Sequence, residues 1–364
     1  MTYNNCTEAS IGNIITTKGF EVSKDTSDCD ILLGVKEVPV HELIDGKTYM
    51  FFSHTTKEQP YNRKLLREIL NKKITLIDYE ALTDQHGKRI IAFGRYAGIV
   101  GAYNGLLTYG KKNDLFEIRR AHECFDLDDL KTEYAKIKLP PIKIVVTGGG
   151  RVSHGAMEVL DGVHIRKVSH HEILSQEFDE PVYAQLHSHH YNKHRAGAAF
   201  SDDDFHRYPA EFRPDFLKFA HQVDLLIAGA YWDPHAPVLF TKEDIRDSNF
   251  KTRVIADITC DIEGSIPTTL RSTTIENPYY DYSPDSLSEA LPFSSEENIT
   301  VMAIDYLPNE LPRNASQDFG DELINNVLPL FLEADDDQVL ERATITKNGE
   351  LTSKYKYLES YVQR

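Results

Sequence analysis

A glycine-rich segment near the middle of the chain carries residues suited to binding phosphate. The run TGGGRVS at residues 147–153 follows an apolar stretch and opens a helical pattern. Glycines in this context allow a tight turn and close approach of the backbone to a pyrophosphate, which then lies at the helix N-terminus. The spacing departs from strict GxGxxG: Gly148 and Gly150 match, Ser153 takes the third place and Gly155 follows two residues later. We interpret the segment as a dinucleotide site, with a purely structural turn as the alternative.

The next predicted strand should carry the residue that reads the ribose of the adenosine. An acidic residue at its end binds a ribose 2′-hydroxyl, whereas a basic residue accommodates a 2′-phosphate. The strand ends in IRKVS at residues 165–169, with no carboxylate at that place. Arg166 and Lys167 therefore favour NADP(H), while the nearby Glu172 keeps NAD(H) open. The alternative is that both basic residues are solvated charges at the edge of a strand.

Ionisable residues follow each of three predicted strands in the first third of the chain. Lys36 and Glu37 follow the first strand, His54 the second and Glu80 the third. Because ligands bind outside the carboxyl ends of strands in open α/β sheets, we expect these groups at one sheet edge. Burial beside an apolar sheet lowers the pKa of a lysine, and histidine titrates near neutrality, so both suit general acid–base work. Any one of them taken singly would more often be structural.

Two aspartates follow a late strand over residues 254–258, which should also end at the ligand-binding edge. Asp261 suits a contact with nicotinamide or with a substrate ammonium group. Asp257 suits the cofactor site as well, and its alternative role is to cap the turn that follows the strand.

Four histidines fall between residues 187 and 194, at His187, His189, His190 and His194. Imidazoles at such spacings can hold zinc. However, no cysteine pair or HExxH motif lies nearby to complete a site, and basic residues flank the histidines. We interpret the segment as a basic loop and predict no metal site.

The elements that position these residues alternate between short apolar runs and amphipathic stretches, the pattern of βαβ units with parallel sheets. We predict strands over 31–35, 49–52, 74–77, 142–146, 163–168, 182–186, 223–228, 254–258 and 299–304, and helices over 62–72, from residue 96 onward and over 323–332. A charged stretch over 126–138 leads to Pro140 and Pro141, which break any helix. We therefore predict an α/β fold of two Rossmann-like domains with mostly parallel sheets and an interdomain cleft. Residues 1–139 form the substrate domain, 140–320 the dinucleotide-binding domain, and 321–364 a segment that returns in part to the first domain.

Composition excludes several classes of function. The 364 residues carry 40 basic and 57 acidic side chains, and this net charge of −17 opposes binding to nucleic acid. No apolar run approaches the roughly 18 residues that span a bilayer, and the amino terminus has no signal-peptide pattern. The four cysteines, Cys6, Cys29, Cys124 and Cys260, form no CxxC pair, so we expect no disulfide and a cytoplasmic setting. The predicted partners are small molecules, with homo-oligomerisation left open.

Several motifs resemble those of a known family. Residues 34–39 (GVKEVP), 52–62 (FSHTTKEQPYN) and 92–98 (AFGRYAG) resemble the lysine-forming saccharopine dehydrogenases, which belong to the alanine dehydrogenase and transhydrogenase superfamily. The second half looks similar to the lysine–ketoglutarate reductase half of the bifunctional lysine-degrading enzyme, through residues 147–156, 229–232, 264–266, 273–278, 311–321 and 354–357. The resemblance extends from about Gly19 to the end of the chain.

This resemblance implies a definite reaction. Family members condense the lysine ε-amine with the ketone of 2-oxoglutarate and reduce the imine with a nicotinamide coenzyme to give saccharopine, or run the reverse. By motif position, Lys36 and His54 match the general acid–base pair. The substrate-binding residues that we expect are Glu37, Lys57, Glu80, Arg89, Phe93 and Asp261. The cofactor-binding residues that we expect are Gly148, Gly150, Arg151, Val152, Ser153, Gly155, Arg166, Gly229 and Asp257.

The resemblance has one departure at the amino terminus. Family members begin with a further strand and a basic loop that ends in an Arg-x-Pro-Leu-like motif and contributes a substrate-binding arginine, and residues 1–18 have no such motif. Two alternatives follow: a related opine-type or amino-acid dehydrogenase with another oxo acid, and a catalytically impaired homologue that binds a dinucleotide as a sensor or assembly partner. Retention of Lys36 and His54 argues against impairment, and the absent arginine argues for it.

Overall fold

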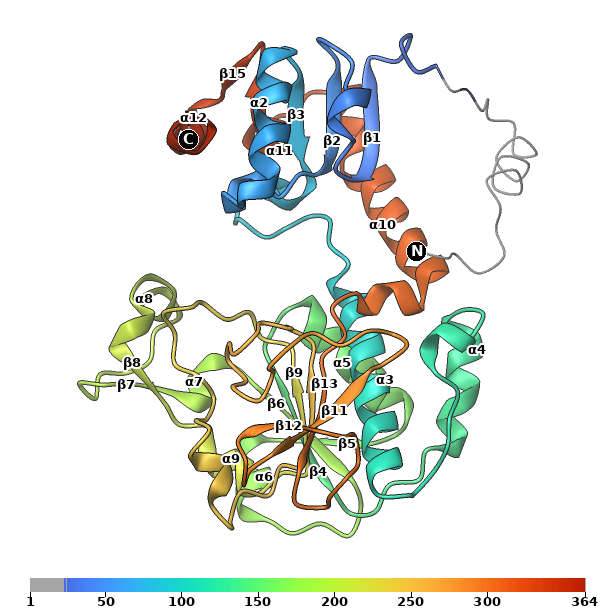
Figure 1. Cartoon of the computed structure of the whole chain (residues 1–364), viewed down its shortest axis with the longest axis vertical. Coiled ribbons are helices and arrows are strands. Elements are labelled where there is room, and N and C mark those ends of the chain that lie inside the picture. Colours follow the sequence, from blue (N-terminus) through green and yellow to red (C-terminus); the bar gives the residue numbers. More distant parts are fainter. Residues whose placement is uncertain (1–22, 24, 364) are drawn as a thin grey trace. The chain divides into compact units, whose positions relative to one another are not determined.

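The computed structural model describes residue 23 and residues 25–363, and the amino-terminal segment discussed above lies outside them. The chain forms two compact units. The first comprises residues 1–92 and 321–364, and the second comprises 93–320 (Figure 1). Both contain a sheet with mostly parallel strands and flanking helices, which confirms the α/β class. The division falls at residue 92 and not at the expected residue 139, because residues 93–139 pack on the second sheet.

The first unit is built on a five-stranded sheet in the order β1-β2-β3-β14-β15. The strands are β1 (Ile31–Lys36), β2 (Thr48–Phe52), β3 (Thr75–Asp78), β14 (Thr344–Lys347) and β15 (Glu350–Leu351). The first three are parallel and confirm the strands predicted there, whereas β14 is antiparallel to β3. The helices are α2 (Arg63–Asn71), α11 (Val339–Ala343) and α12 (Glu359–Gln363), with 3₁₀ turns η1 (Val40–Glu42), η2 (Thr55–Lys57), η3 (Pro60–Asn62), η4 (Tyr79–Ala81), η10 (Leu328–Phe331) and η11 (Ser353–Leu358). Helix α2 confirms the helix expected over 62–72.

The last part of the chain completes this first sheet. The Thr346 hydroxyl accepts a hydrogen bond from the Leu76 amide (3.2 Å) and donates one to the Ile74 carbonyl (2.8 Å). Tyr361 donates its hydroxyl to the carbonyl of Gln59 at 2.6 Å. Segments 270 to 302 residues apart in sequence are therefore joined by hydrogen bonds within this unit.

Helix α10 (Pro312–Asn326) begins and ends earlier than the helix expected over 323–332. Proline is well tolerated in the first turn of a helix, so α10 begins at Pro312. A second proline, Pro329, disfavours helical geometry at Leu328 before it, and residues 328–331 form a separate 3₁₀ turn. The expected helix was therefore wrong in its bounds.

The second unit contains an eight-stranded sheet in the order β12-β11-β13-β10-β9-β4-β6-β5. The strands are β4 (Lys143–Thr147), β5 (Arg166–Val168), β6 (Val182–Leu186), β9 (Leu225–Ala228), β10 (Val254–Asp257), β11 (Tyr279–Ser283), β12 (Ser288–Ala290) and β13 (Ile299–Met302). Strands β7 (Asn192–His194) and β8 (Phe212–Pro214) form a separate two-stranded antiparallel sheet. The six strands predicted in this half are all present and mutually parallel, and β11 and β12 add an antiparallel edge.

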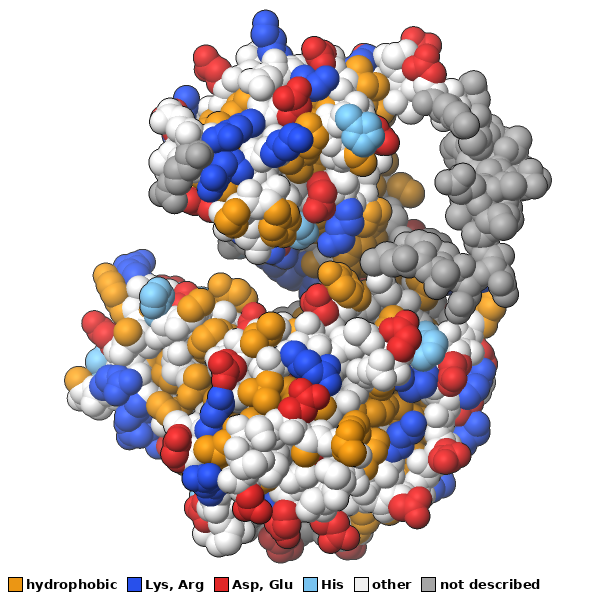
Figure 2. All heavy atoms as spheres, viewed as in Figure 1, with side chains coloured by type: hydrophobic (Ala, Val, Ile, Leu, Met, Phe, Trp, Pro, Cys, Tyr) orange, Lys and Arg blue, Asp and Glu red, His pale blue; other side chains and the backbone are white. Residues whose placement is uncertain are grey.

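Helices cover this second sheet and fill the connections (Figure 1). They are α3 (Gly94–Lys112), α4 (Leu127–Lys131), α5 (Arg151–Gly162), α6 (His170–Ser175), α7 (Ser188–Tyr191), α8 (Asp202–Arg207) and α9 (Leu217–Ala220), with 3₁₀ turns η5 (Ala121–Glu123), η6 (Thr132–Lys136), η7 (Pro209–Glu211), η8 (Asp244–Arg246) and η9 (Leu307–Glu310). Acidic and basic side chains are interspersed over the faces drawn in Figure 2. Among the described residues, no helix is long and apolar enough to cross a bilayer.

Helices α3 and α5 cross with their backbones almost in contact. A Cβ atom on Gly98 would lie 1.9 Å from the carbonyl oxygen of Val152, and one on Gly155 would lie 2.0 Å from that of Arg95. Only glycine fits at both positions, because a carbonyl group within a helix has no room to move aside. The Arg95 guanidinium also donates to both carboxylate oxygens of Glu158 on α5, at 2.9 and 3.0 Å. This crossing is why α3 belongs to the second unit.

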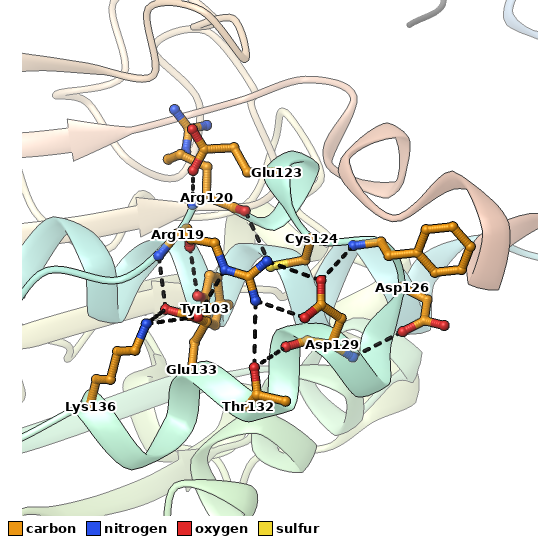
Figure 3. Close-up of polar contacts among 11 residues, drawn as sticks. Tyr103, Arg119, Arg120, Glu123, Cys124, Asp126, Asp129, Thr132, Glu133 and Lys136 are labelled. Carbon is orange, nitrogen blue, oxygen red and sulfur yellow. Dashed lines mark hydrogen bonds and ion pairs between the residues drawn. The ribbon is translucent and has the colours of Figure 1, made fainter. Parts of the chain in front are cut away.

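The charged stretch expected to be a domain boundary is instead an ordered network in the second unit (Figure 3). The Arg119 guanidinium donates to both carboxylate oxygens of Asp129 at 2.8 and 3.0 Å and to Glu133 at 2.9 Å. Lys136 donates to Glu133 at 2.7 Å, and the hydroxyl of Tyr103 on α3 donates to the Arg119 carbonyl at 2.7 Å. Bidentate arginine–carboxylate pairs fix geometry closely, so this network fastens residues 119–136 to α3.

Candidate functional site

The glycine-rich turn joins the carboxyl end of β4 to the N-terminus of α5, as predicted. Gly148 has φ of +106°, which favours glycine, and its amide donates to the Leu186 carbonyl at 2.8 Å. Gly150 is the N-cap of α5, and a Cβ placed there would meet no described atom within 4 Å. Gly229 follows β9 and donates its amide to the Thr147 hydroxyl at 3.2 Å. The turn therefore leaves open the first amides of a 12-residue helix, which suits a pyrophosphate.

The other expected residues of this turn have distinct roles. Ser153 is buried and donates its hydroxyl to the Gly150 carbonyl at 2.9 Å, which closes the turn. Val152 packs against Gly229, where a Cβ would lie 2.9 Å from the Val152 Cγ1. Arg151 begins α5 and is half-buried. Gly155 faces α3, so its lack of a side chain is explained by helix packing and not by ligand access.

The structure corrects the expected position of Arg166. Strand β6, and not β5, adjoins β4, because β5 lies at the outer edge of the sheet. Arg166 is the first residue of β5, pairs with Glu180 at 2.6 Å and lies over the Phe178 ring. It is therefore remote from the carboxyl end of the strand beside the glycine turn, where a ribose-binding residue is needed.

The link from β5 to the glycine turn runs through a different side chain. Gln185 on β6 donates to the Gly148 carbonyl at 3.0 Å and accepts from Lys167 at 3.1 Å. Lys167 thus approaches the turn through Gln185, whereas its neighbour Arg166 does not.

Asp257 is a structural residue, which corrects its expected role in cofactor binding. Its carboxylate is fully buried at the end of β10 and accepts hydrogen bonds from the amide and hydroxyl of Thr259 (3.0 and 2.6 Å) and from the Thr269 hydroxyl (2.6 Å). All three donors fix the following loop, in keeping with the capping alternative.

Asp261 lies exposed in that loop, and partial burial of its carboxyl raises its pKa. Phe93 caps α3 and stacks on Phe319, with ring centroids 5.0 Å apart.

Three of the expected residues of the first unit converge on the carboxylate of a fourth, Glu80. Glu80 Oε1 lies 3.1 Å from Lys57 Nζ and 3.0 Å from Arg89 Nη2, and Glu80 Oε2 lies 3.4 Å from His54 Nδ1. The Glu80 side chain is only 13% exposed, whereas those of Lys57 and Arg89 are each 49% exposed. The two cations can therefore neutralise Glu80 and still face a ligand.

The turn that carries His54 is held by a buried aspartate that sequence reasoning missed. His54 has a left-handed backbone (φ 53°), and its ring stacks near that of Phe52. Asp78, at the end of β3, accepts hydrogen bonds from the amide and hydroxyl of Ser53 and from the amide of Glu80 (2.7 Å). Burial raises the pKa of Asp78. One carboxylate thus positions both His54, through its neighbour, and Glu80.

Lys36 and Glu37 lie at the same sheet edge without joining this cluster. Lys36 is the last residue of β1 and is paired in register with Phe52, two residues before His54. Its side chain is exposed and contacts no carboxylate among the described residues. Glu37 follows it, also exposed. The expected gathering of ionisable groups at the carboxyl ends of three strands is thus present, with Lys36 free to meet a ligand.

Replacing Glu80 with glutamine is expected to lower the Tm by a few degrees at pH 7 and progressively less below pH 5. The contact with His54, followed by the charges of Lys57 and Arg89, lowers the pKa of Glu80 from 4.5 to about 2. The ionised form therefore stabilises the fold above pH 4.5, and this contribution is lost as the pH falls through about 2.

Thermal unfolding of both proteins, followed by circular dichroism from about pH 7 to pH 3, measures this difference. Glu350→Gln, which alters an exposed carboxylate of the same unit, is the matched control and should change the Tm little. A gap between wild type and Glu80→Gln that stays constant across this range would contradict the assignment.

Together, the α/β fold and the open glycine turn are typical of dinucleotide-binding proteins. Two family models match the chain: alanine dehydrogenase/PNT, N-terminal domain, over residues 14–100, and alanine dehydrogenase/PNT, C-terminal domain, over residues 130–354. The chain belongs to this alanine dehydrogenase/PNT family. A solved L-alanine dehydrogenase shares the fold, with a TM-score of 0.60 and 14% identity over 98% of this chain and 89% of that chain.

Curated relatives confirm the resemblance expected from the motifs. The mitochondrial alpha-aminoadipic semialdehyde synthase of Mus musculus is 33% identical over 93% of this chain and 42% of its own length. The saccharopine dehydrogenase [NAD(+), L-lysine-forming] of Neurospora crassa is 24% identical over 82% of this chain and 73% of its own length. The chain spans about two fifths of the length of the mouse protein.

Proposed function

We propose that this chain is an NAD(P)H-dependent oxidoreductase of the saccharopine type, which joins L-lysine to 2-oxoglutarate by reductive condensation or catalyses the reverse. The observation that carries the proposal is the convergence of His54, Lys57 and Arg89 on Glu80, at the sheet edge that also presents Lys36. The names of two relatives, the alpha-aminoadipic semialdehyde synthase of mouse and the L-lysine-forming saccharopine dehydrogenase of Neurospora, support an oxidoreductase of lysine metabolism. We propose that the first unit binds the substrates and the second binds the dinucleotide.

The residues of the first unit suit each part of this reaction. Lys57 and Arg89 are cations half exposed to solvent, and they suit the carboxylates of an oxo acid. Glu80 suits an ammonium group. Imine formation requires a proton to leave the amine and another to reach the departing oxygen, and Lys36 and His54 are the groups we assign to these transfers.

The residues of the second unit suit the coenzyme. Gly148, Gly150 and Gly229 with the first turn of α5 would hold its pyrophosphate. When bound, the nicotinamide ring supplies the reducing equivalent for the imine or accepts it in the reverse direction. We propose NADP(H) over NAD(H), because Glu172, the carboxylate that kept NAD(H) open as an alternative, is engaged with the Ser169 amide at 2.8 Å in a capping box.

We also propose that the protein works in a reducing compartment such as the cytoplasm. The described cysteines, Cys29, Cys124 and Cys260, are all unpaired. Burial raises the pKa of Cys124 to about 11, so this thiol stays protonated and unreactive at neutral pH.

The test is oxidation of NADPH or NADH, followed at 340 nm, with lysine and 2-oxoglutarate present together and with each omitted in turn. The expected result is oxidation that requires both substrates and is faster with NADPH. Oxidation with lysine and a different oxo acid would instead support a related opine-type dehydrogenase. Absence of oxidation with every pair, with NADPH still bound, would overturn the enzymatic proposal and leave a dinucleotide-binding protein.

A further inference from the structure

Five histidine rings lie against one another at the carboxyl ends of β5 and β6. They are His170 and His171 on α6, His187 directly after β6, and His189 and His190 on α7. The ring centroid of His190 lies 3.8 Å from that of His170 and 4.0 Å from that of His189. Only three of the five belong to the histidine-rich segment noted in the sequence. The fourth member of that segment, His194, lies apart from the rings and contacts Glu211 at 3.3 Å.

This histidine cluster borders the glycine turn. Strand β6 is the direct neighbour of β4, and His187 is the first residue after it. A Cβ placed on Gly149 would lie 2.8 Å from the His187 Nδ1. In dinucleotide-binding sheets, the end of the strand beside the glycine strand presents the group that reads the adenosine ribose. Here that place is occupied by imidazoles, where the sequence predicted Arg166.

The cluster does not have the arrangement of a metal site. The rings of His170 and His190 are stacked, with an interplanar angle of 26°, so they present faces to each other and do not converge on one point through their nitrogens. Among the described residues, no group of three or more histidine, cysteine, aspartate or glutamate side chains has a geometry that holds a metal.

Two rings of the cluster, those of His170 and His190, have a pKa below the ordinary value of histidine, which favours their neutral form in the absence of a ligand. Burial, followed by the charges of the neighbouring histidines and Lys218, lowers the pKa of His170 and lowers that of His190 to about 4. His190 Nδ1 accepts the amide hydrogen of His187 at 3.0 Å. A bound dianion would reverse this balance, because it favours the protonated ring.

Other charged groups around the cluster do not supply a fixed cation for that anion. Lys218 on α9 pairs with Asp215, which also accepts from Lys193 at 2.8 Å. On α6, Glu172 is engaged at the helix cap, and on β5, Lys167 is bonded to Gln185. The histidines are therefore the groups whose charge can change at this place.

We propose that this histidine cluster binds the 2′-phosphate of NADP(H) and takes up protons as it does so, which makes the preference for NADP(H) over NAD(H) increase as the pH falls. The proposal rests on the dinucleotide site proposed above and adds the group that selects the coenzyme. Charge-assisted hydrogen bonds from imidazolium to phosphate supply the selectivity.

Binding of NADPH and NADH to the full chain, measured by isothermal titration calorimetry between pH 6 and pH 8, tests the proposal. The phosphate is about half dianionic at pH 6 and almost fully so at pH 8, since its second pKa is about 6. One gained charge-assisted contact corresponds to about a tenfold change, so the ratio of the two affinities should fall about tenfold from pH 6 to pH 8. Titrations in two buffers of different ionisation enthalpy give the number of protons taken up when a coenzyme binds. This number should be larger for NADPH than for NADH. Adenosine 2′-monophosphate should behave like NADPH, and adenosine 5′-monophosphate like NADH.

His187→Gln and His189→Gln alter exposed members of the cluster, so folding should be retained. Each should lower NADPH affinity about tenfold at pH 6, leave NADH affinity unchanged and flatten the pH dependence. His194→Gln, in the same segment but outside the cluster, is the matched control and should bind as wild type. If the ratio of NADPH affinity to NADH affinity is the same at pH 6 and pH 8, or if the variants keep the wild-type ratio, the role of the cluster is overturned. The proposed dinucleotide site is not affected by that result. Failure of both coenzymes to bind would overturn the dinucleotide site and the cluster's role together.

Discussion

Replacing Lys36 with methionine is expected to lower the rate of NADPH oxidation with lysine and 2-oxoglutarate by about 10²- to 10⁴-fold, the usual contribution of a general acid–base group. Methionine keeps the length of the side chain and removes the group that can carry a proton. Lys36 is exposed at the carboxyl end of β1 and contacts no carboxylate among the described residues, so its loss removes no ion pair that supports the fold.

The readout separates chemistry from coenzyme binding. Turnover at 340 nm should fall, while the Kd for NADPH, measured by fluorescence, should stay the same because the glycine turn belongs to the other unit. Lys64→Met changes an exposed lysine on α2 and is the matched control, expected to keep full activity. Unchanged turnover in Lys36→Met would remove this lysine from the mechanism.

Replacing Gly98 with alanine is expected to destabilise the second unit by about 3 kcal/mol, the upper end of the usual range for overpacked positions. The added methyl group would lie 1.9 Å from the Val152 carbonyl oxygen, which is backbone inside α5 and cannot rotate away. Helices α3 and α5 would have to separate, and Val152 stands at the glycine turn. We therefore expect weaker NADPH binding together with a lower midpoint of urea denaturation, followed by circular dichroism.

Gly320→Ala provides the comparison for this variant. Gly320 also lies inside a helix, but a Cβ there would meet no described atom within 4 Å. Alanine should therefore stabilise α10 by about 0.5–1 kcal/mol through its better helix propensity. A Gly98→Ala protein with the wild-type midpoint would show that the two helices are not held at the distance described.

Much of the architecture was predictable from periodicity. Apolar runs bounded by turns located the parallel strands of both sheets, and the charged residues after three of them marked the edge where His54 and Glu80 meet. The order of strands was not predictable in the same way. The sequence of a βαβ unit has the same pattern whether its second strand pairs with the first or lies one position further out in the sheet. The exchange of β5 and β6 is what displaced Arg166 from the ribose position.

The sequence predicted the residues of the candidate site better than the residues that hold them in position. Asp78 reads in the sequence as a polar residue after a strand, and only the three-dimensional contacts with Ser53 and Glu80 reveal its positioning role. His170 and His171 escaped notice because their partners in the cluster come from a different strand end. Gly155 is expected from the sequence to be part of the cofactor site, but the structure explains this glycine by the packing of α5 on α3. Helix packing and phosphate binding can both require a glycine, so the sequence did not distinguish between them.

The pairing of β14 with β3 has a consequence for how the protein is made. The second unit is continuous from residue 93 to residue 320 and can fold as soon as the ribosome has released it. The first unit cannot, because Leu76 on β3 awaits a partner 270 residues later in the chain. Throughout that interval β3 exposes an unpaired edge, the kind of surface that attracts other extended chains and recruits chaperones. Slow or interrupted translation beyond residue 320 would therefore leave a completed nucleotide-binding half attached to an unfinished and aggregation-prone partner.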